Sequence, residues 1–164
     1  MGLTLETWDE SGWDLLERCN TPAMTVYLGG PESAQKLADR HSRYLNFAKT
    51  GRDAWPLRVL LDGEPVGSVG YWDDETAFEM GWAIVPEFQG RGLARESVGL
   101  ALDHAAANGL HDSVTANPGV TNLASNAVAH SAGFVLQKQH EVEYPIGTMM
   151  LANLWRYDLA HRVL

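Results

Sequence analysis

The chain has 164 residues, of which 45% are hydrophobic and 20% are charged, an ordinary composition for a soluble domain with a buried core. Its 12 basic and 21 acidic side chains give a net charge of −9, which disfavours nonspecific binding to nucleic acid or to an anionic membrane. No apolar stretch approaches the roughly 20 residues that span a membrane, and residues 1–6 lack the basic and apolar regions of a signal peptide. We therefore expect a cytoplasmic protein.

The hydrophobic pattern predicts one domain over residues 1–164, with strands and helices in mixed order. The predicted elements are, in chain order, a strand at 3–7, helices at about 11–19 and 31–49, strands at 57–61, 66–72 and 77–85, a helix at 93–107, a strand at 113–116, a helix at 122–131, and strands at 135–144 and 149–158. Cys19, the only cysteine, falls on the apolar side of the first helix and is expected to be a packed side chain. The six histidines lack the close spacing of a zinc site, so no metal is expected.

Turn signals indicate how the three central strands are connected. Asp62-Gly63 is typical of a tight hairpin, and the acidic turn at 73–75 separates the next two strands. Pro86 ends the third strand. These signals predict an antiparallel meander of strands followed by helices and further strands, which is a mixed α+β architecture.

The segment after Pro86 has the composition of a phosphate-binding loop. Gly90 and Gly92 bracket Arg91, and glycine allows the backbone to approach a ligand closely. The first turn of the following helix has unpaired N–H groups and a partial positive charge, which favour an anion. A P-loop would need Gly-Lys followed by Ser or Thr, and the dinucleotide fingerprint would need a glycine where Arg95 stands. A plain strand–turn–helix connection is the alternative.

Three segments resemble motifs of the GNAT superfamily of N-acetyltransferases. Gln89-Gly90-Arg91-Gly92-Leu93-Ala94 resembles the Q/R-x-x-G-x-G/A signature of that superfamily. Residues 79–86 resemble the strand E-x-G-Y/W-x-I/L-x-P of its RimJ/RimL-like branch. Asn122 to Ser125, followed by Gly133-Phe134, resembles the N-x-x-S…G-F segment of the same branch. The order and intervals of the three motifs are those of the branch, and together they cover about a third of the chain.

The resemblance implies a mostly antiparallel twisted sheet of about seven strands with about four helices, splayed apart between strands 4 and 5. It also implies acetyl-CoA as cosubstrate, with the pyrophosphate held by the loop and the pantetheine arm paired along residues 83–85. The cofactor-binding residues that it predicts are Ala83, Ile84, Val85, Gln89, Gly90, Arg91, Gly92, Leu93, Ala94, Arg95, Asn122 and Ser125.

Acetyl transfer needs a neutral amine, a stabilised oxyanion and a proton for the departing thiolate. Glu79 is the predicted base; a solvated strand residue or a partner of an arginine is the alternative. A backbone N–H of Ala83 or Ile84 is the expected oxyanion donor. Many GNAT enzymes carry a tyrosine acid where this chain has Ala129, and the branch offers a serine instead, so Ser125 is the predicted acid; an ordinary polar residue of the helix is the alternative.

The acceptor is expected to be an amine, either a protein N-terminus or a small molecule, bound between the first two helices and the last hairpin. Asn122 would bind the pantetheine arm, cap its helix, or do both. Aromatic side chains are candidates for the pocket walls, with burial in the core as the alternative for each: Trp13, Tyr44, Trp55, Trp72 and Trp155.

Two functions of other classes stay open at this point. A GNAT fold can bind acyl-CoA as a non-catalytic module, and a glycine loop can bind a nucleotide. The intact loop together with Glu79 and Ser125 favours catalysis. A homodimer is compatible with the family, and neither nucleic acid nor a membrane is an expected partner.

Overall fold

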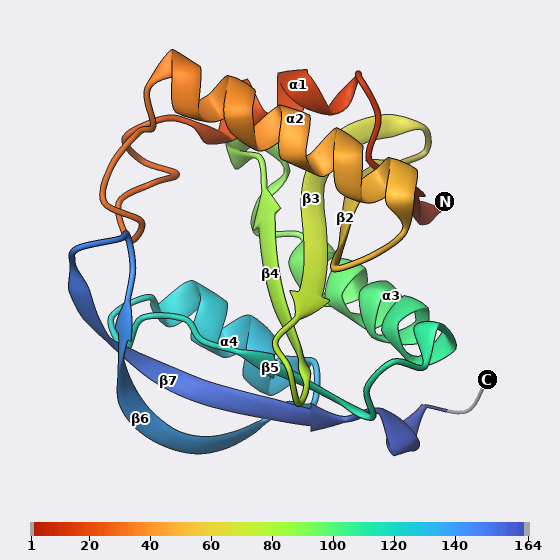
Figure 1. The fold of residues 1–164 in the computed structure, drawn as a ribbon, viewed down its shortest axis with the longest axis vertical. Coiled ribbons are helices and arrows are strands. Elements are labelled where there is room, and N and C mark those ends of the chain that lie inside the picture. The colour runs from red at the N-terminus through yellow and green to blue at the C-terminus, as the bar shows by residue number, and fades with distance from the viewer. Residues whose placement is uncertain (1, 163–164) are drawn as a thin grey trace.

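The structure, a computed structural model, describes residues 2–162, and its centre is a seven-stranded sheet flanked by helices (Figure 1). The strands are β1 (Leu3–Thr7), β2 (Ala54–Leu61), β3 (Glu64–Asp73), β4 (Phe78–Ile84), β5 (Ser113–Ala116), β6 (Val135–Glu143) and β7 (Met149–Asp158). The α-helices are α1 (Gly12–Cys19), α2 (Ala34–Thr50), α3 (Leu93–Asn108) and α4 (Leu123–Ser131), and short 3-10 helices lie at Pro86–Phe88 and Leu159–His161. Of the helices within residues 2–162, none has both the length and the apolar character that crossing a membrane requires.

The strands are ordered β1-β2-β3-β4-β5-β7-β6, and neighbouring strands are antiparallel except for β4 and β5. That parallel pair is short: it joins Phe78 to Val114 and Glu79 to Thr115. Beyond Glu79 the strands separate, and in Figure 1 β4 rises away from β5 and β7. The mixed α+β fold and the opening between the fourth and fifth strands are therefore confirmed.

Helices cover both faces of the meander, with α1 and α2 on one side and α3 on the other (Figure 1). The main core lies between the sheet and α3, where Val98, Ala101 and Leu102 are fully buried. A second, smaller cluster contains Trp8 and Leu15 and packs under α1 and α2. Because each face has its own apolar layer, the strand that leads into the glycine loop is held from both sides.

Cys19, at the end of α1, packs against the second cluster, as predicted from its position in the sequence. Burial raises the pKa of its thiol to about 11, and the opposing effect of the Arg18 charge is smaller. The thiol is therefore protonated at neutral pH and is a packing group.

Most elements differ from their predicted bounds by one to three residues at one or both ends, and two differences have a local cause. β2 begins at Ala54 and includes Pro56, although proline is uncommon inside strands. The carbonyl of Pro56 accepts the backbone N–H of Trp8 at 3.1 Å. The side of Pro56 that lacks an N–H therefore faces Trp8, one residue past the end of β1, where the ladder between β1 and β2 has ended. The turn at Leu159–His161 was not predicted, and the side chain of Asp158 caps it by accepting a backbone N–H.

Candidate active site

A tight loop joins the end of β4 to the start of α3. Its backbone passes through Gly90 and Gly92, with φ angles of 75° and 76°, in the left-handed region that favours glycine. A Cβ atom at either position would meet nothing within 4 Å. The loop therefore turns at its two glycines and leaves open space beside its backbone.

The backbone N–H groups of this loop are unpaired. Within residues 2–162 no hydrogen bond uses the N–H groups of residues 90–95, and Gly92, at the N-cap of α3, has no side chain to cap the helix. The first N–H of the helix that is paired belongs to Glu96, which donates to the Gly92 carbonyl at 3.1 Å. Unpaired donors at the positive end of a 16-residue helix are suited to bind phosphate.

The polar side chains of the loop have different surroundings. Gln89 donates from Nε2 to the Ile84 carbonyl at 2.9 Å, and so fastens the loop to the end of β4. Arg91 donates to the Glu87 carbonyl at 3.3 Å. Arg95 is exposed on the first turn of α3. We infer that Gln89 shapes the loop, whereas Arg91 and Arg95 place positive charge beside it.

The hydrogen-bond register of β4 decides which N–H groups face the opening. Val85 donates to the Val66 carbonyl, and the pairing with β3 continues without a shift to Phe78. Because successive residues of a strand point their N–H groups to opposite sides, the backbone N–H groups of Trp82 and Ile84 face away from β3. The contact between the Ile84 carbonyl and Gln89 agrees with this direction. This alternation favours Ile84 over Ala83 as a donor and adds Trp82, which sequence reasoning missed.

Glu79 lies where β4 and β5 separate. Phe78 and Met80 are buried on the α3 side of β4, and Glu79 is half-buried on the other face together with Gly81 and Ala83, because side chains alternate along a strand. Asn117, in the segment after β5, donates from Nδ2 to Glu79 Oε1 at 2.9 Å. The carboxylate therefore stands at the closed end of the opening, on the strand that leads to the glycine loop.

Burial raises the pKa of the Glu79 carboxyl above its usual range. The hydrogen bond from Asn117 acts against this, because it stabilises the ionised form, and the side chain of Trp72 acts in the same direction as Asn117. The negative charge of Asp74 adds to the increase. A half-buried carboxylate with a raised pKa is suited to accept a proton, since its conjugate acid is less acidic than that of an exposed glutamate.

The family of the protein follows from its sequence over most of its length. Residues 2–135 match the family model described as acetyltransferase (GNAT) domain. The chain belongs to the GNAT acetyltransferase family.

Solved GNAT structures share this architecture. RimL, a ribosomal L7/L12 α-N-protein acetyltransferase in complex with coenzyme A, is 22% identical, with 95% of this chain and 93% of that chain covered and a TM-score of 0.80. AAC(6')-Ib in complex with paromomycin and acetyl-CoA is 19% identical, with 99% and 98% covered and a TM-score of 0.79. Spermidine N-acetyltransferase from Vibrio cholerae, in complex with coenzyme A and spermine, is 18% identical, with 96% of each chain covered and a TM-score of 0.78. At these identities the similarity shows a shared GNAT fold.

The third GNAT motif begins at the N-terminus of α4, which follows β5 in the chain. Asn122 caps α4, since its Oδ1 accepts the backbone N–H of Ser125 at 3.2 Å. Within residues 2–162 no hydrogen bond occupies the Ser125 hydroxyl, which is half-buried. Ala129, at the position of the GNAT tyrosine, is fully buried and carries no proton to give. Asn126, not singled out from the sequence, ties α4 to β7 by accepting the indole N–H of Trp155 at 2.8 Å.

The aromatic candidates for the acceptor pocket separate into distinct groups. Trp55 stacks on Tyr71 and Trp155 is 7% exposed, so both belong to the main core of this GNAT domain. Trp13 lies against His41 between α1 and α2. Trp72 is 39% exposed and approaches the position of Gly81, beside Glu79. Trp72 is therefore the candidate wall that lies next to the predicted base.

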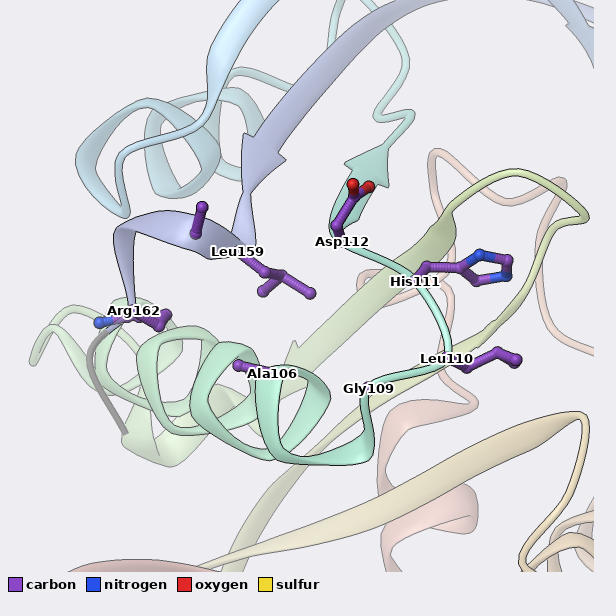
Figure 2. A pocket seen from close by; sticks show the side chains of 8 residues that line it. Ala106, Gly109, Leu110, His111, Asp112, Leu159 and Arg162 are labelled. Atoms are coloured by element: carbon purple, nitrogen blue, oxygen red, sulfur yellow. The ribbon is translucent and has the colours of Figure 1, made fainter.

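A separate cavity of about 590 Å³ opens at the far end of α3, and Figure 2 shows its lining side chains. The helix has 16 residues and a length of about 24 Å, so this cavity is remote from the GNAT loop at the other end. Two of its polar side chains already have partners: His111 Nε2 lies 2.7 Å from Asp73 Oδ1, and Arg162 Nε lies 3.5 Å from Asp103 Oδ1. We therefore assign the chemistry to the opening between β4 and β5. Within residues 2–162 no group of three or more metal-ligating side chains is placed to hold a metal ion.

Proposed function

We propose that the protein transfers the acetyl group of acetyl-CoA to an amine, with Glu79 as the general base and Ser125 as the acid. Acetyl-CoA supplies an activated acetyl group as a thioester. The amine nitrogen forms the new C–N bond as the C–S bond breaks. The nitrogen of the neutral amine loses one proton to Glu79, directly or through water, and the departing thiolate takes a proton from the Ser125 hydroxyl. Glu79 then releases its proton to solvent and Ser125 regains one from solvent, which restores both groups.

The opening between β4 and β5 carries this proposal. Unpaired N–H groups of residues 90–95 lie at one end, backbone N–H groups of Trp82 and Ile84 line its edge, and Glu79 stands at the other end. Trp82 and Glu79 are three residues apart, about 10 Å along the strand, which leaves room for the reacting groups between them. The backbone N–H of Trp82 is accordingly the proposed oxyanion donor.

The loop offers groups that suit the diphosphate of coenzyme A. The two glycines leave open space, the N–H groups need an acceptor, and Arg91 and Arg95 supply charge beside them. The Ile84 N–H would then pair with the pantetheine arm, and Asn122 can donate from its amide nitrogen while its oxygen caps α4.

The proposed acceptor is a cationic amine, on a protein N-terminus or on a small molecule. The structural relatives support an amine, because they are described as acting on a protein α-amine or bound to paromomycin or spermine. The net charge of −9 and the Glu79 carboxylate favour an acceptor that arrives protonated and positive. Such an amine must lose one proton before attack and a second as the C–N bond forms, and we assign both transfers to Glu79, which releases the first proton to solvent before it accepts the second.

The function can be tested with a panel of amino acids, polyamines, aminoglycosides and N-terminal peptides, assayed for acetyl-CoA-dependent thiol release and for the acetylated product. We expect turnover with at least one class of amine. Binding of coenzyme A without acetylation of any panel member would instead favour a non-catalytic acyl-CoA-binding module. Tighter binding of ATP or NAD than of coenzyme A would point to a nucleotide-binding protein.

Replacing Ser125 with Ala should lower kcat by about 10-fold and leave the dissociation constant for coenzyme A nearly unchanged. The loss is modest because a thiolate is a fairly good leaving group and water can replace the serine. Ser131→Ala is the matched control, since Ser131 lies at the other end of α4 and bonds to the Val128 carbonyl. An unchanged kcat in Ser125→Ala would leave water as the acid.

A further inference from the structure

The candidate base is the end point of a chain of hydrogen bonds that crosses the sheet. Asn117 donates from Nδ2 to Glu79 Oε1 at 2.9 Å, and its Oδ1 lies 2.7 Å from His140 Nε2. The three residues come from β4, from the segment after β5, and from β6. Glu79 and Asn117 are 38 residues apart in sequence, and Asn117 and His140 are 23 apart, so the fold brings them together.

The side-chain amide of Asn117, between Glu79 and His140, fixes which group donates and which accepts in each hydrogen bond. An ionised carboxylate is an acceptor only, so the NH₂ group of Asn117 must face Glu79 and its oxygen must face His140. His140 must then carry a proton on Nε2 and donate it to Asn117 Oδ1. The reverse orientation would place the Asn117 oxygen against the carboxylate. The charge on Glu79, the orientation of Asn117 and the proton position on His140 are therefore linked.

The sheet leaves room for this arrangement at one place. Thr115 is the last residue of β5 that pairs with β4, and Asn117 follows two residues later on the same face, just where the strands separate. On the other side, β7 lies between β5 and β6, and the residue directly opposite His140 is Ala152, which is fully buried. Residues opposite one another on neighbouring strands share a face, so the small Ala152 side chain lets the imidazole reach across β7.

We propose that Asn117 and His140 are positioning residues for Glu79, with His140 acting through the Asn117 amide to hold the carboxylate in one orientation. Asn117 occupies Oε1, so Oε2 is left to meet the amine or a bridging water. Neither residue contacts the reacting groups in this scheme. The proposal rests on the proposed function in that it assigns a purpose to the orientation of Glu79.

Several other groups also affect the pKa of Glu79, and the hydrogen bond from Asn117 acts against those that raise it. Trp72 lies on the β3 side and favours the ionised form, and Asp74, in the turn between β3 and β4, disfavours it. Burial is the largest influence and also disfavours ionisation. Asn117 is the largest influence in the opposite direction, so removing it should make Glu79 harder to ionise.

The test is the titration of the Glu79 carboxyl by NMR in protein labelled with ¹³C-glutamate, without any substrate. In Asn117→Ala, the midpoint should move to higher pH than in the wild type, because a donor to the ionised form is lost. His140→Ala should move it in the same direction by a smaller amount, since the amide is then free to turn. His140→Gln should restore the wild-type midpoint, because glutamine places an N–H donor where Nε2 was.

Kinetics with one confirmed acceptor provide the second readout. Asn117→Ala should lower kcat by about 10-fold through misplacement of the base, with the KM for acetyl-CoA unchanged and the acidic limb of the pH–rate profile moved upward. His111→Gln is the matched control, because His111 makes an equally short contact to Asp73, at 2.7 Å, that does not lead to Glu79. Melting temperatures identify any variant that fails to fold. If the alanine variants fail to fold, His140→Gln is compared with the wild type instead.

The outcomes separate this inference from the proposed function. If Glu79 titrates at the same pH in the wild type, Asn117→Ala and His140→Ala, the Asn117–His140 pair does not act on the carboxyl and the inference is wrong. If the titration moves as expected while Glu79→Gln keeps full activity, Asn117 and His140 do position the Glu79 carboxyl, but Glu79 is not the base.

Discussion

Replacing Glu79 with Gln should lower kcat by about 10²–10³-fold, which is the usual contribution of a general base. The side chain keeps its size and can still accept the hydrogen bond from Asn117, so the loss isolates the basicity. In the wild type, activity should fall as the pH drops through the raised pKa of Glu79, because only the ionised form accepts a proton. The variant should lose this acidic limb and recover part of its rate at high pH, where the amine is already neutral.

The control for this change is Glu75→Gln, which removes the same charge from an exposed residue in the turn between β3 and β4. Its pH–rate profile should match that of the wild type. Equal rates and the same acidic limb in Glu79→Gln and the wild type would show that positioning of a neutral amine, without a base at this residue, carries catalysis.

The Glu79→Gln variant should be more stable than the wild type at neutral pH. Because folding raises the pKa of Glu79, ionisation of this group weakens the folded state at pH values above that pKa and has no effect where both states are protonated. The melting temperature of Glu79→Gln should therefore exceed that of the wild type at neutral pH, and the difference should disappear in acid. A gain of stability with a loss of rate is the behaviour of a functional carboxylate kept in a half-buried place.

Replacing Gly92 with Val should raise the dissociation constant for acetyl-CoA at least ~10-fold, about 1.4 kcal/mol. Gly92 has a φ of 76° and sits among the unpaired N–H groups of the loop, so a branched side chain there would occupy the space that a phosphate needs. The measurement is calorimetric titration with coenzyme A and with acetyl-CoA.

Gly109→Val separates the loss of binding from the strain of the substitution. Gly109 caps the other end of α3 with a φ of 78°, and a Cβ atom there also meets nothing within 4 Å. Both variants should lose similar stability, because both force a branched residue into the left-handed region. Normal binding by a folded Gly92→Val variant would falsify the loop assignment.

The parts of the fold that were predictable from the sequence have local signals. Asp62-Gly63 fixed the hairpin between β2 and β3, and Pro86 marked the end of β4, because turn chemistry and proline geometry act within a few residues. The glycine loop was found for the same reason. The start of β2 at Ala54, three residues before the predicted strand, was missed, because it depends on the pairing of Ala54, Trp55 and Pro56 with residues 70–72 of β3.

The parts that were missed depend on which strands lie next to one another. Asn117 and His140 carry no signal of their own. Asn117 meets Glu79 because β5 lies beside β4, and His140 meets Asn117 across β7, which lies between β5 and β6. The choice among the N–H groups of β4 also needed the register with β3, which shows that Trp82 and Ile84 face the opening. Pairing over long sequence separations is not encoded in any single segment.

The burial of Cys19 has a consequence for the thiol chemistry of the whole molecule. With a pKa of about 11, roughly one thiol in 10⁴ is ionised at pH 7. The thiolate is the form that attacks thioesters and disulfide reagents, so the folded protein should neither acetylate itself at Cys19 nor add to the thiol signal of a turnover assay. Once α1 detaches from its apolar cluster, the same thiol becomes reactive. The rate at which Cys19 is labelled should then measure how often that helix opens.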